Sequence, residues 1–149
     1  MSSIENTIGM RFFTVYGPWG RPDMALFNFT KNILAGKEIK VFNNGDMVRD
    51  FTYIDDIIDG VTILLAQSGK HIYNIGRGEK VQLMDFVGEI EKNLNQKAKI
   101  RMASMHPADA KETWSDTTKL KVLGYNPKVS IEEGVSKFVH WYKNYYRIN

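Results

Sequence analysis

Arg21 stands in surroundings that suit the recognition of an anion. A strand-like run of aromatic and β-branched residues (12–16) leads into a loop in which Gly20 and Pro22 flank this arginine. A guanidinium presents a planar fork that matches a carboxylate or a phosphate, and a loop stiffened by proline loses little entropy on binding. Because α/β proteins bind ligands at the carboxyl ends of their strands, this loop is a candidate binding site. The alternative is a surface arginine paired with Asp23.

Arg49 is the second candidate. It belongs to the run V-R-D-F-T-Y-I-D-D-I at residues 48–57, where the residues alone favour a solvated strand edge at Arg49 and Asp50. Phe42 ends the strand-like run E-I-K-V-F, and a single aromatic residue in a strand is more often part of the core than of a binding site. The residues themselves therefore mark these positions without giving them a chemical role.

Catalytic and metal-binding patterns are absent from the sequence. No G-x-G-x-x-G turn of the dinucleotide-binding type occurs, because the one G-x-G, at residues 76–78, lacks the third glycine. No Tyr-x-x-x-Lys pair occurs, there is no cysteine, and the three histidines give no metal-ligand spacing and no Ser-His-Asp arrangement. We therefore predict no catalytic residue and no metal site, and we assign no cofactor-binding residue.

The elements that must position these side chains alternate between strands and helices, so the predicted class is α/β. Expected strands are residues 8–16, 38–42, 47–54, 71–75 and 98–103, and expected helices are residues 23–34, 55–65, 83–94, 116–124 and a last helix from residue 130. Asp23, then Asp55 or Asp56, and Ser130 are the expected N-caps of three of these helices. An Asn-Asn-Gly turn separates strands 38–42 and 47–54, which favours their pairing as a hairpin.

The helix expected at residues 55–65 should bury a single stripe of apolar residues. Its apolar residues are spaced for one face, and Gly60 within it indicates a close approach of backbones. The stripe consists of Ile57, Ile58, Val61, Leu64 and Leu65.

A long run supports a family resemblance. The segment F-F-T-V-Y-G-P-W-G-R-P-D-M-A, residues 12–25, resembles the loop of nucleotide-sugar epimerases in the extended short-chain dehydrogenase/reductase superfamily, with the closest resemblance to UDP-glucuronate 4-epimerases. Residues 48–57 are the second specific run. The resemblance covers residues 9–146, yet only the second half of a family member. It implies the substrate-binding part of that fold plus the last Rossmann strands, without the N-terminal NAD-binding half.

The resemblance implies five substrate-binding residues. The residues that match Thr14 and Arg21 contact the sugar carboxylate in the family, which fits a uronic acid better than a neutral hexose. The arginine that matches Arg49 binds the pyrophosphate, the position of Phe42 lies near the uracil ring, and the aspartate that matches Asp109 contacts the ribose. Asp50 and Asp55 look structural by the same comparison.

The resemblance also sets the expected cofactor. Full-length relatives use NAD to oxidise C4 of the sugar and return hydride to the other face, with the tyrosine of the Tyr-x-x-x-Lys pair as acid and base. This chain lacks that pair and the Gly-rich turn, so we expect it to bind a UDP-sugar, to bind no NAD by itself and to be inactive alone. His106 departs from the family pattern, which usually has Gln or Arg there.

Composition limits the alternatives. The net charge of +3 is small and scattered, which argues against a nucleic-acid partner. The absence of cysteine fits a reducing compartment, and neither an apolar run of membrane length nor a signal-peptide core is present, so we expect a cytoplasmic protein. We expect residues 1–149 to form one domain, truncated relative to the family and linked to polysaccharide biosynthesis through the resemblance.

Two hypotheses about its role stay open. The first is the substrate-binding half of a UDP-sugar epimerase, inactive alone, for which a complementing N-terminal half is a possible partner. The second is a stand-alone nucleotide-sugar-binding or regulatory module that acts with a partner chain or as a homodimer, because an uncovered surface should be apolar.

Overall fold

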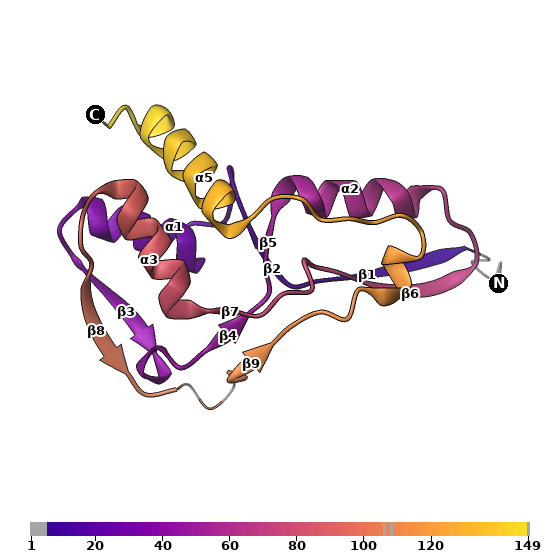
Figure 1. Cartoon of the computed structure of the whole chain (residues 1–149), viewed down its shortest axis with the longest axis horizontal. Coiled ribbons are helices and arrows are strands. Elements are labelled where there is room, and N and C mark those ends of the chain that lie inside the picture. The colour runs from indigo at the N-terminus through magenta and orange to yellow at the C-terminus, as the bar shows by residue number, and fades with distance from the viewer. Residues whose placement is uncertain (1–5, 106, 108, 149) are drawn as a thin grey trace, which may run out of the picture.

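Strands and helices alternate along the chain, which confirms the α/β class (Figure 1). The computed structural model describes residues 6–105, 107 and 109–148. The elements in order are β1 (Thr7–Phe12), β2 (Thr14–Tyr16), α1 (Ala25–Leu34), β3 (Glu38–Phe42), β4 (Val48–Arg49), β5 (Phe51–Tyr53), α2 (Ile54–Leu65), β6 (Lys70–Ile75), β7 (Val81–Gln82), α3 (Leu83–Leu94), β8 (Lys99–Ala103), β9 (Glu112–Thr113), α4 (Thr118–Lys121) and α5 (Ile131–Tyr146).

The elements gather in two groups. Figure 1 shows β1, β6, α2 and α4 toward one end, and α1, α3, α5, β3 and β8 toward the other, with β2, β5, β4 and β7 between them. Three parallel pairs, β1–β6, β2–β5 and β3–β8, and a short sheet in the order β7-β4-β9 make up the described strands. The mostly parallel pairing requires the long crossovers that α1, α2 and α3 supply.

Two expected strands are each divided. The first expected strand changes its pairing partner between residues 13 and 14. The Phe13 amide donates to the Ile75 carbonyl of β6 (3.3 Å), whereas the Thr14 amide donates to the Asp50 carbonyl, just before β5 (3.0 Å). The expected strand 8–16 therefore becomes β1 and β2 in different sheets, and 47–54 divides into β4 and β5 at Asp50. The strand expected at residues 71–75 is confirmed as β6.

The expected hairpin is wrong. β3 pairs with β8, whereas β4 pairs with β7 and β9. Asn43, Asn44 and Gly45 all have positive φ and form a 3-10 turn that sends the chain away from β3 instead of back along it.

Two of the expected N-caps are also wrong. Met24 and Tyr53 hold the cap positions of α1 and α2, without a side-chain hydrogen bond. Asp23 binds Arg21 instead, while Asp56 accepts hydrogen bonds from the amides just before α5. The Ser130 cap is confirmed, because its hydroxyl accepts from the Glu133 amide at 3.2 Å.

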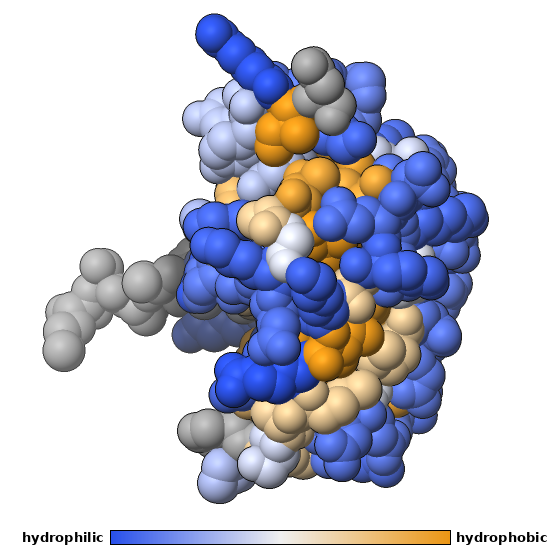
Figure 2. Space-filling model, turned by 90° about the vertical axis from the view of Figure 1, so that its left-hand side faces the viewer, coloured by the Kyte–Doolittle hydropathy of each residue, from blue (hydrophilic) through white to orange (hydrophobic). Residues whose placement is uncertain are grey.

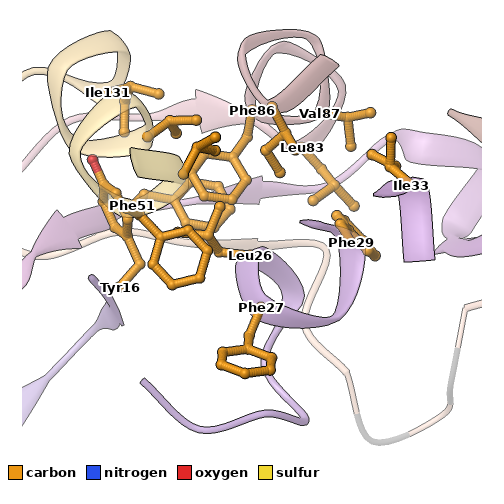
Figure 3. Packing of buried hydrophobic residues seen from close by; sticks show 14 of the residues in the cluster. Tyr16, Leu26, Phe27, Phe29, Ile33, Phe51, Leu83, Phe86, Val87 and Ile131 are labelled. Atoms are coloured by element: carbon orange, nitrogen blue, oxygen red, sulfur yellow. The ribbon is translucent and has the colours of Figure 1, made fainter. Parts of the chain in front are cut away.

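The larger core lies between α1, α3, α5 and the central strands (Figure 3). The rings of Phe51 and Phe86 stack with centroids 3.9 Å apart, and Tyr16 meets Phe86 edge-on at 5.5 Å. The fully buried residues of α3 and α5 follow helical spacing and are Phe86, Val87 and Ile90 in α3 and Val135 and Phe138 in α5.

A smaller core lies between α2, β6 and α4. Ile57 and Leu64 are buried there with Tyr73 and Ile75. A Cβ atom at Gly60 would meet the side chains of Ile75 and Tyr125, so the packing at Gly60 is close, but against side chains and not against another backbone as predicted.

The stripe on α2 is narrower than predicted. Ile58 and Leu65 are 54% and 77% exposed and do not belong to it. Within the described residues, no helix has both the length and the apolar character to cross a bilayer.

Candidate functional site

A pocket of about 440 Å³ opens between α1, β3, β4 and β5. Its walls are largely apolar, and a few polar groups converge on it, as is usual for small-molecule sites. The apolar lining comes from Met24, Ala25, Phe29, Phe42, Met47, Phe51 and Leu83, and the polar lining from Thr14, Asp23, Asn28, Lys40 and Arg49.

Strand alternation places two of these residues together. Ile39 and Val41 of β3 are fully buried, so Lys40 and Phe42 share the opposite face of the strand. The Lys40 ammonium lies 4.4 Å from the centroid of the Phe42 ring, and both side chains line the pocket. An aromatic surface and a cation thus meet at one wall.

Backbone carbonyl groups hold Arg49. Its Nη2 donates to the Ala110 carbonyl (2.8 Å), and its Nη1 donates to the carbonyls of Val48 (2.8 Å) and Lys111 (3.2 Å). Over the described ranges these partners are carbonyl oxygens and not carboxylates, so the positive charge is oriented without being neutralised by an ion pair. An anion in the pocket therefore meets a fixed cation.

Asp109 comes directly before this carbonyl segment. It is exposed and does not line the pocket itself. The hydrogen bonds from Arg49 to residues 110 and 111 bring the Asp109 backbone close to the pocket wall. His106, the departure from the family pattern, lies outside the described residues.

Arg21 lies at the edge of the pocket. Its guanidinium grips Asp23 in a bidentate pair, with Nε···Oδ1 at 3.1 Å and Nη2···Oδ2 at 2.5 Å. The hydrogen bond from Arg21 lowers the pKa of the Asp23 carboxyl below its usual value. The pairing that the sequence offered as the alternative is thus present. Asp23 lines the pocket, and Arg21 lines a small adjoining recess that shares Thr14 with it.

Asp50 is a structural centre beside the site. Its side chain is fully buried and accepts from the amides of Arg77 (2.9 Å), Gly78 (3.0 Å) and Ser115 (3.1 Å). The hydroxyls of Thr52 and Ser115 also bond it. The amides at residues 77 and 78 are therefore used inside the protein, so the described residues do not fit the pyrophosphate of a dinucleotide at this G-x-G turn.

The structure brings together most of the predicted site. Thr14, Phe42 and Arg49 line one pocket, and Arg21 lines the adjoining recess. Asp109 does not line the pocket, but it comes directly before Ala110 and Lys111, whose carbonyl groups bind Arg49. Lys40 and Asn28 were not among the predicted residues. The alternation of E-I-K-V-F could have identified Lys40, because it must face the same way as Phe42. Among the described residues, no three His, Cys, Asp or Glu side chains are grouped to hold a metal.

Comparison with known proteins gives three kinds of match. Residues 5–76 match the NAD dependent epimerase/dehydratase family. The chain is 44% identical over 136 residues to UDP-glucuronate 4-epimerase of Thermodesulfobacterium geofontis, covering 90% of this chain and 42% of that protein. It is 42% identical over 160 residues to UDP-glucuronate 4-epimerase 1 of Arabidopsis thaliana, covering 95% and 37% respectively.

A solved structure agrees. UDP-glucuronic acid 4-epimerase of Bacillus cereus, in complex with UDP-glucuronic acid and NAD, superposes with a TM-score of 0.87 at 35% identity and covers 92% of this chain and 45% of that one. The chain thus spans about half the length, or less, of the relatives it matches. These matches confirm the resemblance carried by residues 12–25 and 48–57.

Proposed function

Because the chain is a relative of the nucleotide-sugar epimerases of the extended short-chain dehydrogenase/reductase superfamily, we propose that it binds UDP-glucuronate in the 440 Å³ pocket. The observation that carries this proposal is the convergence of Arg49, Lys40 and Phe42 on one cavity beside Thr14. Two cations suit a pyrophosphate, and an aromatic wall suits a base.

Each part of the ligand has a partner in the proposal. Arg49, held by backbone carbonyls, binds the pyrophosphate, and Lys40 adds charge beside it. Phe42 packs near the uracil, and Asp109 bonds the ribose. Arg21 and Thr14 bind the sugar carboxylate at the recess. To bind the sugar carboxylate, Arg21 must loosen or break its ion pair with Asp23. This costs little free energy because both side chains are mostly exposed, at 75% and 63%.

In this proposal, the reaction needs groups that the described residues do not supply. NAD supplies the hydride chemistry at C4 when it is bound, and the described residues offer no turn for it. The chain alone therefore binds the sugar nucleotide without converting it. Its role is to hold the substrate by the pyrophosphate and the carboxylate.

An uncovered strand edge supports the proposal of a partner. Over the described residues, β1 pairs only with β6, although parallel sheets are normally covered on all sides. Phe12 of β1 and Ile72 of β6 are 52% and 54% exposed. We propose that an NAD-binding half covers this edge. The second hypothesis, a regulatory module or homodimer, uses the same pocket and edge and differs in giving no turnover with any added half.

An amide NMR titration tests the binding proposal. Addition of UDP-glucuronate to the purified chain should shift the amides of Thr14, Lys40, Phe42 and Arg49, while those of β1 and α2 stay in place. Dispersed peaks that do not respond would contradict binding by the chain alone. Turnover of UDP-glucuronate by the purified chain would contradict the proposed inactivity.

A further inference from the structure

We propose that Trp19 is a positioning residue, which holds the loop of Arg21 against α5 and thereby sets the preference for a carboxylated sugar. The inference rests on the proposed function, since it concerns the same pocket. Trp19 lies between the end of β2 and Arg21, and it is 73% exposed.

The backbone at Trp19 is strained. The Gly20 amide bonds the Gly17 carbonyl at 3.2 Å and closes a turn, in which Trp19 has φ of +61°. This is the turn position where glycine is preferred, because a Cβ atom disfavours the left-handed region. Strain of this kind persists only where surrounding contacts enforce it.

Those contacts come from α5. The Trp19 ring meets Trp141 at 5.3 Å and Tyr145 at 5.0 Å between centroids, both edge-on. Trp141 and Tyr145 are one helical turn apart and stack at 5.4 Å. They form an aromatic shelf (Trp141 and Tyr145) on α5, and the loop after β2 rises beside this helix in Figure 1. Edge-to-face packing is a favoured aromatic geometry.

The shelf fixes one end of the Arg21 loop, and α1 fixes the other. The Met24 amide bonds the Arg21 carbonyl at 3.1 Å just before α1 begins. Between Trp19 and Met24 lie Gly20, Arg21, Pro22 and Asp23. Without the Trp19 contact, the loop contains two glycines, at 17 and 20, and the backbone that carries Arg21 beside the recess becomes less ordered. A looser loop binds a carboxylate less well, because ordering it costs entropy.

Three variants change the contact, and one of them, Tyr145→Ala, does so without altering the strain at Trp19. Trp19→Gly removes the ring and relieves the φ strain, Trp19→Phe keeps a ring, and Tyr145→Ala removes half of the shelf without changing the loop. Because Trp19 and Tyr145 are exposed, the fold should persist, which dispersed NMR spectra would check. The first readout needs no ligand: ¹⁵N relaxation of the Gly20 and Arg21 amides should show faster motion in Trp19→Gly and Tyr145→Ala, with Trp19→Phe near the unchanged protein. Equal order in all proteins would overturn the inference.

The second readout is selectivity. The affinity ratio of UDP-glucuronate to UDP-glucose should fall roughly three- to tenfold in Trp19→Gly, since one charge-assisted contact weakens, while UDP affinity stays constant. An unchanged ratio in Trp19→Gly, where the unchanged protein does discriminate, would also overturn it. If the unchanged protein binds neither sugar, the proposed function fails instead, and the relaxation data alone decide the role of Trp19.

Discussion

Gly134 leaves the space that the Tyr16 hydroxyl group occupies. A Cβ atom at residue 134 would overlap the Tyr16 Oη atom, and the same hydroxyl donates to the Ser130 carbonyl at 3.4 Å. The end of β2 therefore rests directly on the first turn of α5. Burial raises the pKa of Tyr16, so its hydroxyl stays protonated and able to donate. This contact and the Trp19 contact together make α5 the support of the Arg21 loop.

Gly134→Ala should destabilise the protein even though alanine favours helices. Overpacking against Tyr16 should lower the free energy of unfolding by about 1–3 kcal/mol. The matched control is Gly88→Ala in α3, where nothing lies near the added methyl group. This control should gain about 0.5–1 kcal/mol from helix propensity alone. Urea unfolding measures both, and equal gains in the two variants would contradict the close contact.

Asp50→Asn should be among the most damaging conservative changes. The buried carboxylate accepts from three amides and two hydroxyls, and an amide side chain would turn an NH₂ group toward some of these donors. The expected loss of unfolding free energy is about 1–3 kcal/mol for each donor left without an acceptor. Asp59→Asn, at an exposed position of α2, is the control and should change stability by less than about 0.5 kcal/mol. A loss at Asp50 as small as that of the control would show that the centre is dispensable.

Glu91 should make stability depend on pH. Burial raises the pKa of Glu91, but hydrogen bonds from the Lys97 ammonium (2.6 Å) and the Ala98 amide (2.8 Å) outweigh it, so the pKa is lower than in the unfolded chain. A depressed carboxyl pKa stabilises the fold above the unfolded value and loses this contribution as pH falls through the folded value.

The variant Glu91→Gln tests that dependence. It should cost about 1 kcal/mol near pH 7 and much less at an acidic pH below the lowered pKa of Glu91, where the native carboxyl is protonated too. Urea unfolding at the two pH values gives the difference. A cost that is the same at both would mean that packing, and not charge, accounts for the role of Glu91.

Much of the fold was predictable because it follows from local patterns. The helical spacing of Phe86, Val87 and Ile90 defines α3, and the alternation of Ile39 and Val41 defines β3. The breaks at Phe13 and Asp50 were not predictable, because each depends on a partner strand elsewhere in the chain. The predicted N-cap of α2 was wrong for a similar reason, because Asp56 accepts hydrogen bonds from amides more than 70 residues away in the chain.

The site shows the same division. The residues alone favoured a solvated strand edge at Arg49, and only the resemblance supplied its expected role. The hydrogen bonds from Arg49 to the Ala110 and Lys111 carbonyls could not be predicted, because they require β4 to pair with β9, about 60 residues away in the chain. Lys40 was within reach of strand alternation alone, once Phe42 was taken to face the ligand.

Calorimetric titration of UDP and UDP-glucuronate into the chain and three variants tests the binding account most directly. Arg49→Ala should weaken both ligands by roughly tenfold to a hundredfold, because a charge-assisted contact to the shared pyrophosphate is lost. Arg21→Ala should weaken UDP-glucuronate alone, and Arg11→Ala, on β1 away from the pocket, should weaken neither. Equal binding of both ligands by all four proteins would contradict the account.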